Sequence, residues 1–290
     1  GSDWRGVCSR PPGPRAGLRC PPARPREVGR GPPHTPLRGL AGAEIPPIVL
    51  RGAYDPAHCA GLIRRFVGWG LMRDPTLPNA ADQRKRIDIG TSLGNRGHDR
   101  EAFLTHAQST LELFPHLFDG FADPVQTLYA ALQALALDKQ VKTAREPDGR
   151  LYGPAIFRIH YESHSYPPHI DSVKWREART NYDVYRFEHQ FAGILCLQNS
   201  RHGERVAQTI VHQCLWTPEI QPHLAGNTFP EYAAAHGVGQ YRVEPARGAL
   251  YFFNPRCIHE IPPLDGDDPR IVLAVFIGYS PDDNEIYVWS

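Results

Sequence analysis

The sequence of 290 residues lacks a charge imbalance, a long apolar run and an internal repeat. Lysine and arginine total 32 against 31 acidic residues, which gives a net charge of +1. This balance argues against a basic nucleic-acid-binding protein and against an acidic, disordered chain. No stretch of about 18 apolar residues is present, so we expect no membrane-spanning segment.

The cysteines are few and show no characteristic spacing. The six residues form neither a CxxC pair nor a disulfide framework. In a chain of this length, such cysteines are typical of a reduced, intracellular protein. We therefore expect a cytoplasmic location.

Proline and glycine are abundant, and part of the surplus lies at the start of the chain. Residues 1–43 hold nine of the 29 prolines, with eight arginines and two acidic residues, so their net charge is +6. They show little apolar periodicity, which predicts a disordered leader followed by one domain over residues 44–290. The leader is also rich in arginine and poor in acidic residues, as organelle transit peptides are, although it has few serines. A basic arm for an anionic partner is a third alternative.

Residues 55–140 are expected to be mainly helical. Asp55 and Asp123 each precede a proline and an apolar periodic run, and Asp99 precedes another such run. An aspartate at the N-cap with proline in the first turn is typical of a helix start. A short strand is expected just before this segment, at residues 48–50.

Residues 150–290 have a different texture, with short β-branched and aromatic runs between turn residues. The expected strands lie at 155–161, 191–197, 206–213, 249–253 and 271–279. Helices followed by many short strands predict an α+β fold that is mainly β, a sandwich or barrel supported by helices. Small-molecule sites of such folds lie in the mouth of the barrel.

Three residues in this β-rich part form a candidate metal site. His169 and Asp171 follow one predicted strand, and His259 follows another. Two imidazoles and one carboxylate on one face of iron(II) leave positions open for a bidentate co-substrate and dioxygen (O2). Arg270 opens the next strand, and its planar guanidinium suits the distal carboxylate of 2-oxoglutarate. A His-x-Asp pair alone is expected about once by chance in this chain. The prediction of a metal site therefore rests on the pair together with His259 and Arg270.

The chain from about Pro46 to Ser290 resembles a group of iron(II)/2-oxoglutarate oxygenases that contains the freestanding halogenases of hapalindole- and welwitindolinone-type alkaloids. The resemblance rests on segments IVLRGA at 48–53, PDGRLYGPA at 147–155, Gly248 to His259, the step from His259 to Arg270, and NEIYVWS at 284–290. It implies a double-stranded β-helix, or jelly roll, with flanking N-terminal helices. It also implies that Fe(II), 2-oxoglutarate and O2 are used.

One residue departs from the halogenase pattern. The carboxylate position of the triad is glycine in those halogenases, and chloride takes its place on iron, whereas this chain has Asp171. We therefore expect hydroxylation or another oxidation of an unactivated C–H, with release of succinate and CO2. The expected substrate is a small molecule such as an amino acid derivative or an alkaloid.

Six further residues are candidates for the site. Strand alternation places Arg158 on the same face as His160, which predicts a second anion contact for the co-substrate or the substrate. Gln190 precedes a core strand and could reach the iron region. By the resemblance, the remaining candidate positions lie near the substrate: Tyr166, Lys174, Ile87 and Asp88.

Two other functions stay open at this point. The same chemistry could act on a protein side chain, with the basic leader as a docking arm. A jelly-roll binding protein without catalysis is the other alternative, although the intact triad and Arg270 argue against it. A nucleic-acid partner is not expected, because residues 44–290 carry a net charge of −5.

Overall fold

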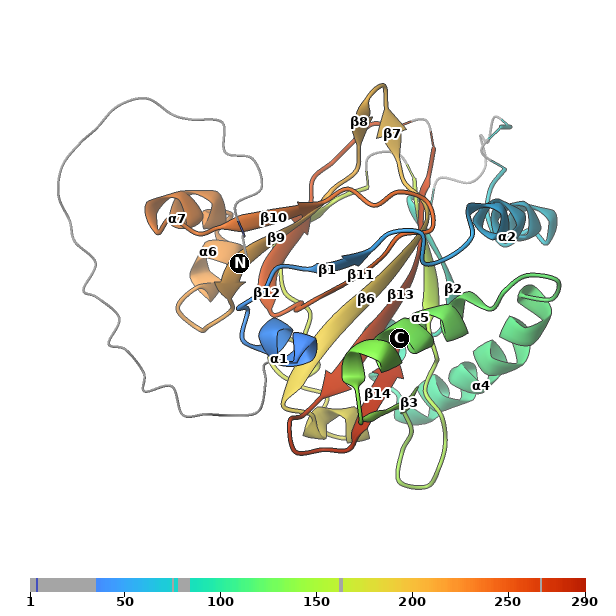
Figure 1. Ribbon diagram of the computed structural model, residues 1–290, viewed down its shortest axis with the longest axis horizontal. Helices are drawn as coiled ribbons and strands as arrows, with labels where there is room; N and C mark the ends of the chain where they lie inside the picture. Colours follow the sequence, from blue (N-terminus) through green and yellow to red (C-terminus); the bar gives the residue numbers. More distant parts are fainter. Residues whose placement is uncertain (1–3, 5–34, 75, 78–83, 162–163, 267) are drawn as a thin grey trace.

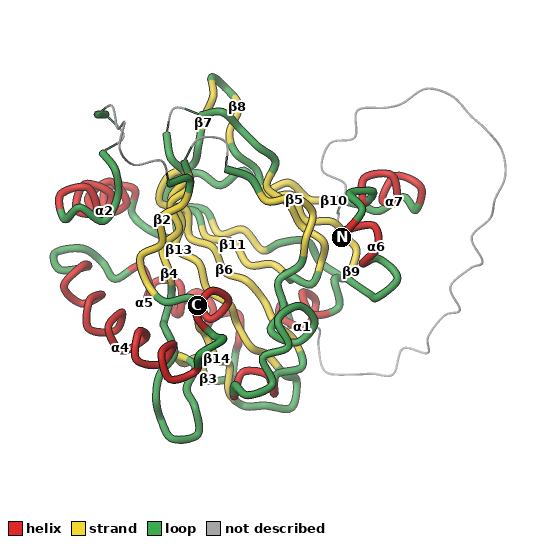
Figure 2. The backbone as a smooth tube through the Cα atoms, turned by 180° about the vertical axis from the view of Figure 1, so that it is seen from behind, coloured by secondary structure: helices red, strands yellow, loops and turns green. Residues whose placement is uncertain are grey.

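The computed structural model describes residues 4, 35–74, 76–77, 84–161, 164–266 and 268–290. Two facing β-sheets form its centre, with helices packed beside them (Figures 1 and 2). This is the jelly-roll arrangement expected from the sequence.

Within the described residues the larger sheet has eight strands. Its main path runs β1-β11-β6-β13-β14-β3, while β4 pairs with β13 and β2 pairs with β4. Neighbouring strands are antiparallel, apart from the parallel pair β14 and β3. The strands are Ile48–Leu50 (β1), Arg86–Gly90 (β2), Gln140–Thr143 (β3), Ile156–His160 (β4), His189–Gln198 (β6), Leu250–Phe253 (β11), Arg270–Tyr279 (β13) and Glu285–Trp289 (β14).

The smaller sheet has four described strands in the order β10-β9-β12-β5, all antiparallel. They are Tyr166–His169 (β5), Thr209–Leu215 (β9), Gln240–Val243 (β10) and Cys257–Ile261 (β12). A short hairpin, Arg201–His202 (β7) and Arg205–Val206 (β8), stands apart from both sheets.

The long helices cover the side of the larger sheet that faces away from the smaller one, whereas α6 and α7 lie beside the smaller sheet (Figures 1 and 2). The three long ones are Pro56–Gly68 (α2), Arg100–Leu117 (α4) and Pro124–Ala136 (α5). The shorter helices are Pro36–Ala41 (α1), Leu93–Arg96 (α3), Asp183–Arg186 (η1), Gln221–Ala225 (α6) and Phe229–Ala235 (α7). None of the described helices is long and apolar enough to cross a membrane.

Strand β4 shows how the larger sheet separates the core from the interior of the sandwich. Phe157 and Ile159 point toward the helices and are fully buried in the main hydrophobic cluster. The alternate residues Ile156, Arg158 and His160 line a cavity between the sheets. The period of two along a strand therefore assigns one face to packing and the other to chemistry.

The predicted helix starts are confirmed. Asp55, Asp99 and Asp123 each accept a hydrogen bond from a backbone N–H in the first turn of α2, α4 and α5. The expected strands also match β1, β4, β6, β9, β11 and β13 within a few residues. The helical stretch 55–140, however, contains strand β2, whose side chains alternate between the helices and the cavity.

The leader boundary differs from the expectation. Residues 36–41 form helix α1, and Leu37 and Leu40 are buried in the main cluster. The side-chain amide of Asn254 donates to the Leu40 carbonyl at 3.0 Å, which ties this helix to the sheet region. The packed part of the described chain therefore includes residues 36–41, which the expected leader had covered. Residues 1–34 lie outside the described residues, apart from the buried Trp4.

The position of the His-x-Asp pair also differs. It does not end the 155–161 strand: His169 is the last residue of a separate strand, β5, in the other sheet, and Asp171 lies just beyond it. Pro167 and Pro168 concealed this strand in the sequence, since proline removes a hydrogen-bond donor and is tolerated at sheet edges. Strand β5 is such an edge.

Phe157 should dominate the stability of the interface between sheet and helices, because its ring contacts Phe66, Phe114 and Phe118. Phe157→Ala is expected to lower the free energy of unfolding by about 3–5 kcal/mol, measured by urea denaturation. The matched control Leu77→Ala removes a side chain that is 63% exposed and should change it by less than about 0.5 kcal/mol. Equal effects of the two substitutions would contradict this packing.

Candidate metal centre and cavity

The three predicted metal ligands come together where strands β5 and β12 pair. His169 and His259 are register partners on these antiparallel strands, and their ring centroids lie 4.2 Å apart. Asp171 follows two residues after His169, and its backbone N–H donates to the Pro255 carbonyl at 3.0 Å. The candidate ligand atoms of the three residues lie within 4.8 Å of one another.

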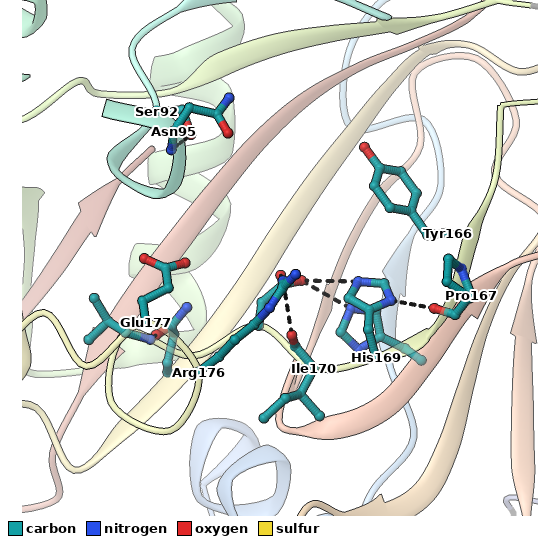
Figure 3. Close-up of polar contacts among 12 residues, drawn as sticks. Ser92, Asn95, Tyr166, Pro167, His169, Ile170, Arg176 and Glu177 are labelled. Carbon is teal, nitrogen blue, oxygen red and sulfur yellow. Dashed lines mark hydrogen bonds and ion pairs between the residues drawn. The ribbon is translucent and has the colours of Figure 1, made fainter. Parts of the chain in front are cut away.

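Backbone carbonyls fix the orientation of both imidazoles. The Nδ1 atom of His169 lies 2.7 Å from the Pro167 carbonyl, and that of His259 lies 2.8 Å from the Cys257 carbonyl (Figure 3). A carbonyl only accepts, so each Nδ1 must carry the proton and donate it. The Nε2 lone pairs of the neutral rings are then free to bind a metal, as in most histidine metal sites.

The contact between His259 and Asp171 tests whether a cation fits here. The Nε2 atom of His259 lies 3.1 Å from Oδ2 of Asp171, and Nε2 of His169 lies 3.6 Å from the same oxygen. Burial lowers the pKa of His259, so a proton between these atoms is disfavoured. Acceptor atoms that face each other this closely need a cation between them. The residues therefore fit a divalent metal, and two imidazoles with one carboxylate suit iron(II).

The carboxylate of Asp171 is held from both sides. Burial alone would raise the pKa of Asp171, but its polar surroundings keep that pKa below the ordinary value, so the group is a carboxylate. The guanidinium of Arg176 donates to the other oxygen, Oδ1, at 3.0 Å and to the Ile170 carbonyl at 3.3 Å (Figure 3). Oδ2 is thus the oxygen directed at the metal position.

A cavity of about 510 Å³ between the two sheets opens onto these ligands. This volume is within the range of about 300–1,000 Å³ typical of small-molecule sites. Both sheets contribute to the lining, together with helix α3 through Ser92 and Asn95. The cavity can therefore hold a co-substrate and a small substrate beside the ligands.

Arg270 lines this cavity at the start of β13, as predicted, and is only 8% exposed. Its guanidinium donates to Nδ1 of His160 at 3.4 Å, and among the described residues no carboxylate lies within 4.0 Å of it. The hydroxyl groups of Tyr251 and Thr209, 2.8 Å apart, line the same cavity, and the Tyr251 hydroxyl also interacts with Arg270. A buried cation without a counter-ion is unfavourable, so this corner is suited to an anion such as a carboxylate.

Tyr166 lies in the cavity next to His169, with ring centroids 5.7 Å apart. Its hydroxyl is 2.9 Å from Nε2 of His160. Burial and the nearby Arg270 lower the pKa of His160, so this ring is neutral. Since its Nδ1 accepts from Arg270, its Nε2 carries the proton and donates to Tyr166. The predicted place of Tyr166 in the site agrees with this geometry.

Arg158 faces the cavity, as strand alternation predicted, but it is paired with another candidate residue. Its guanidinium lies 3.2 Å from Oδ2 of Asp88, on the adjacent strand β2. Arg86 binds the same oxygen at 3.2 Å. Asp88 therefore acts in the site by holding two arginines.

Three predicted substrate residues are placed elsewhere. Ile87 points away from the cavity and is buried in the core cluster beneath the helices, because it alternates with Asp88 along β2. The ammonium group of Lys174 lies 5.3 Å from the centre of the Tyr185 ring and does not line the cavity. Gln190 does not line the cavity either, but its Oε1 accepts from the Val173 N–H at 2.9 Å and so braces the loop after Asp171.

Several cavity residues were not predicted: Arg86, Ser92, Asn95, Arg176, Glu177, Thr209 and Tyr251. Residues 86–90 alternate with a period of two, and this pattern could have predicted that Arg86 and Asp88 share one face of a strand. No sequence signal marks Arg176, because it reaches Asp171 only through the turn in which its N–H bonds to the Ser172 carbonyl.

The jelly roll, the His-Asp-His cluster and the buried Arg270 together define an iron(II)/2-oxoglutarate-dependent oxygenase. The family model "Carrier-protein-independent halogenase WelO5" matches residues 35–290, so the chain belongs to this family. The expected cofactors, Fe(II), 2-oxoglutarate and O2, fit both the family and the cluster. Comparison with curated protein sequences gave no match.

One enzyme of known structure shares the fold, and a second is reported with a lower similarity. An N-substituted L-amino acid dioxygenase from Burkholderia ambifaria AMMD, in complex with alpha-KG, is 16% identical with a TM-score of 0.54. The match covers 88% of this chain and 90% of that one, and a second structure of the same enzyme gives the same values. HygX from Streptomyces hygroscopicus, with nickel and 2-oxoglutarate bound, is 10% identical with a TM-score of 0.45, and the match covers 84% and 85% of the two chains.

Metal affinity tests the cluster directly. His259→Ala removes one converging nitrogen, so we expect the affinity for Co(II) or Mn(II) to fall by more than about 100-fold, measured by titration calorimetry without oxygen. The control His202→Ala alters an exposed histidine on the β7–β8 hairpin and should leave the affinity unchanged. Unaltered binding in the His259 variant would exclude the assignment.

Proposed function

We propose that the protein is an Fe(II)/2-oxoglutarate-dependent hydroxylase that oxidises an unactivated C–H of a small molecule and releases succinate and CO2. The observation that carries this proposal is the carboxylate of Asp171 beside His169 and His259, 3.1 Å from Nε2 of the latter. Family membership supports the cofactor chemistry.

The contacts that hold Asp171 in place favour oxygenation over halogenation. In the halogenases that this chain resembles, glycine leaves room for chloride at the third ligand position. Here Arg176 donates to the carboxylate of Asp171 and the Pro255 carbonyl accepts from its backbone N–H, with Oδ2 turned toward the two histidines. A halide would have to displace an anchored anion.

The residues of the chain divide the work within the cavity. His169, Asp171 and His259 would hold iron(II), which supplies the reaction of 2-oxoglutarate with O2 when bound. Arg270 would bind the distal carboxylate of 2-oxoglutarate, with the Tyr251 and Thr209 hydroxyls beside it. Apolar side chains of β6 and β13 would exclude water from the reacting C–H, and they are Ala192, Ile194, Val272, Ala274, Val275 and Phe276.

Substitution of Asp171 tests the type of reaction. Asp171→Ala should abolish hydroxylation, because only two ligands remain. Asp171→Gly in chloride should yield some chlorinated product, because a halide can then take the vacated position. The measurement is succinate formation together with mass spectrometry of a substrate panel, for products heavier by one oxygen atom or carrying chlorine. Full hydroxylation by the alanine variant would show that Asp171 is not a ligand.

Substitution of Arg270 tests the binding of 2-oxoglutarate. Arg270→Ala removes a bidentate, charge-assisted contact of about 2–3 kcal/mol, so the affinity for 2-oxoglutarate should fall by roughly 30- to 150-fold. Calorimetry with the Mn(II)-loaded protein measures this affinity. Arg242→Ala is the control, because Arg242 is an exposed residue of β10. An unchanged affinity for 2-oxoglutarate in the Arg270 variant would remove this role.

A further inference from the structure

Strands β2 and β4 present a second cationic group to the cavity, separate from Arg270. Asp88 and Arg158 are register partners, and the pair of Arg86 and His160 lies two residues further along the same strands. Arg86 and Arg158 both bind Oδ2 of Asp88, each at 3.2 Å, and the Asn95 side-chain amide lies 3.4 Å from that oxygen. Two guanidinium groups thus share one carboxylate, and the cluster keeps a net positive charge.

Arg158 has N–H donors that no residue in the described part of the chain uses. A guanidinium carries five N–H donors, and the contact of Arg158 with Asp88 is its only side-chain hydrogen bond within the described part of the chain. The side chain is 19% exposed and lines the cavity. Its remaining donors are therefore available to a ligand inside the cavity, and a partly desolvated cation favours an anionic one.

The proposed position of 2-oxoglutarate leaves Arg158 to bind a different anion. Arg270 pairs with His160 and Val272 pairs with Arg158, so the two arginines lie on adjacent strands two residues apart. Strand spacing and rise put their Cα atoms about 8 Å from each other. In the proposed function, one carboxylate of 2-oxoglutarate would lie at the metal and the other at Arg270, so Arg158 would bind an anionic group of the substrate.

The charges along the cavity agree with a further anion. Four arginines line it, at positions 86, 158, 176 and 270, against the carboxylates of Asp171 and Glu177 in the lining and that of Asp88 between Arg86 and Arg158. The carboxylate of Glu177 lies 3.6 Å from the guanidinium of Arg179, so its charge is already offset. A metal ion adds positive charge, and 2-oxoglutarate removes only part of the excess.

Apolar side chains continue from the arginines along the same sheet. Ile156 lies two residues before Arg158 and on the same face of β4. The register partner of Ile156 is Ala274, which pairs in turn with Ile194. All three line the cavity. The cavity therefore offers a cationic end and an apolar floor within one continuous surface.

We propose that the substrate is an apolar carboxylic acid, whose carboxylate binds Arg158 and Arg86 while its hydrocarbon part lies along Ile156, Ala274 and Ile194. This rests on the proposed hydroxylase function and names its class of substrate. The Arg86–Asp88–Arg158 cluster is the specificity element, and the side-chain amide of Asn95, from α3, lies against its carboxylate.

The test compares an acid with its amide. Phenylpropanoate and phenylpropanamide are titrated by calorimetry into the full chain loaded with Mn(II) and 2-oxoglutarate, so that no turnover occurs. The acid should bind at least about tenfold more tightly than the amide, as a charge-assisted pair requires. Arg158→Gln should reduce this preference to about twofold or less and leave the affinity for 2-oxoglutarate unchanged, whereas Arg158→Lys should retain part of it. The matched control Arg242→Gln should behave as wild type.

Three results would overturn the proposal. The first is equal affinity for acid and amide in the wild-type protein, and the second is no binding of the acid at millimolar concentration. Neither depends on the stability of a variant. The third is a loss of 2-oxoglutarate affinity in Arg158→Gln with the acid preference intact, which would assign Arg158 to the co-substrate. Failure of the hydroxylase function itself would appear separately, as no succinate from the Fe(II)-loaded protein.

Discussion

The pairing of β5 with β12 is the constraint on which the site depends. It makes His169 and His259 register partners, and the carbonyl two residues before each histidine fixes the proton on Nδ1. Both Nε2 lone pairs then converge on the carboxylate of Asp171, an arrangement that needs a cation. Backbone geometry, and not the flexibility of the side chains, therefore prepares the metal position.

The larger sheet performs two tasks through the alternation of its strands. Its outer face carries Phe157 and the other aromatic residues that bind the helices, and its inner face carries Arg158, His160 and Arg270. Charged groups can lie this deep because each has a hydrogen-bond partner, such as Asp88 for Arg158 and His160 for Arg270. The same sheet thus supplies both the stability of the fold and the polarity of the cavity.

Much of the fold could be predicted because it depends on local pattern. Helix caps at Asp55, Asp99 and Asp123 and the β-rich runs are written in consecutive residues, and the structure agrees with them. Strand β5 escaped because its two prolines disguise an edge strand, and β2 escaped because it interrupts a helical stretch. Helix α1 escaped because a short helix in a proline-rich segment is stabilised by packing and not by its own sequence.

By itself, the sequence determined the identity of the main site residues: two histidines, one aspartate and one arginine at recognisable spacing. These depend on residue type and strand order, which the chain carries directly. Only the tertiary structure decided which neighbours complete them. Arg176 reaches Asp171, Asp88 joins Arg86 to Arg158, and Ile87 and Lys174 turn away, because each outcome depends on contacts between strands and loops that are distant in the chain.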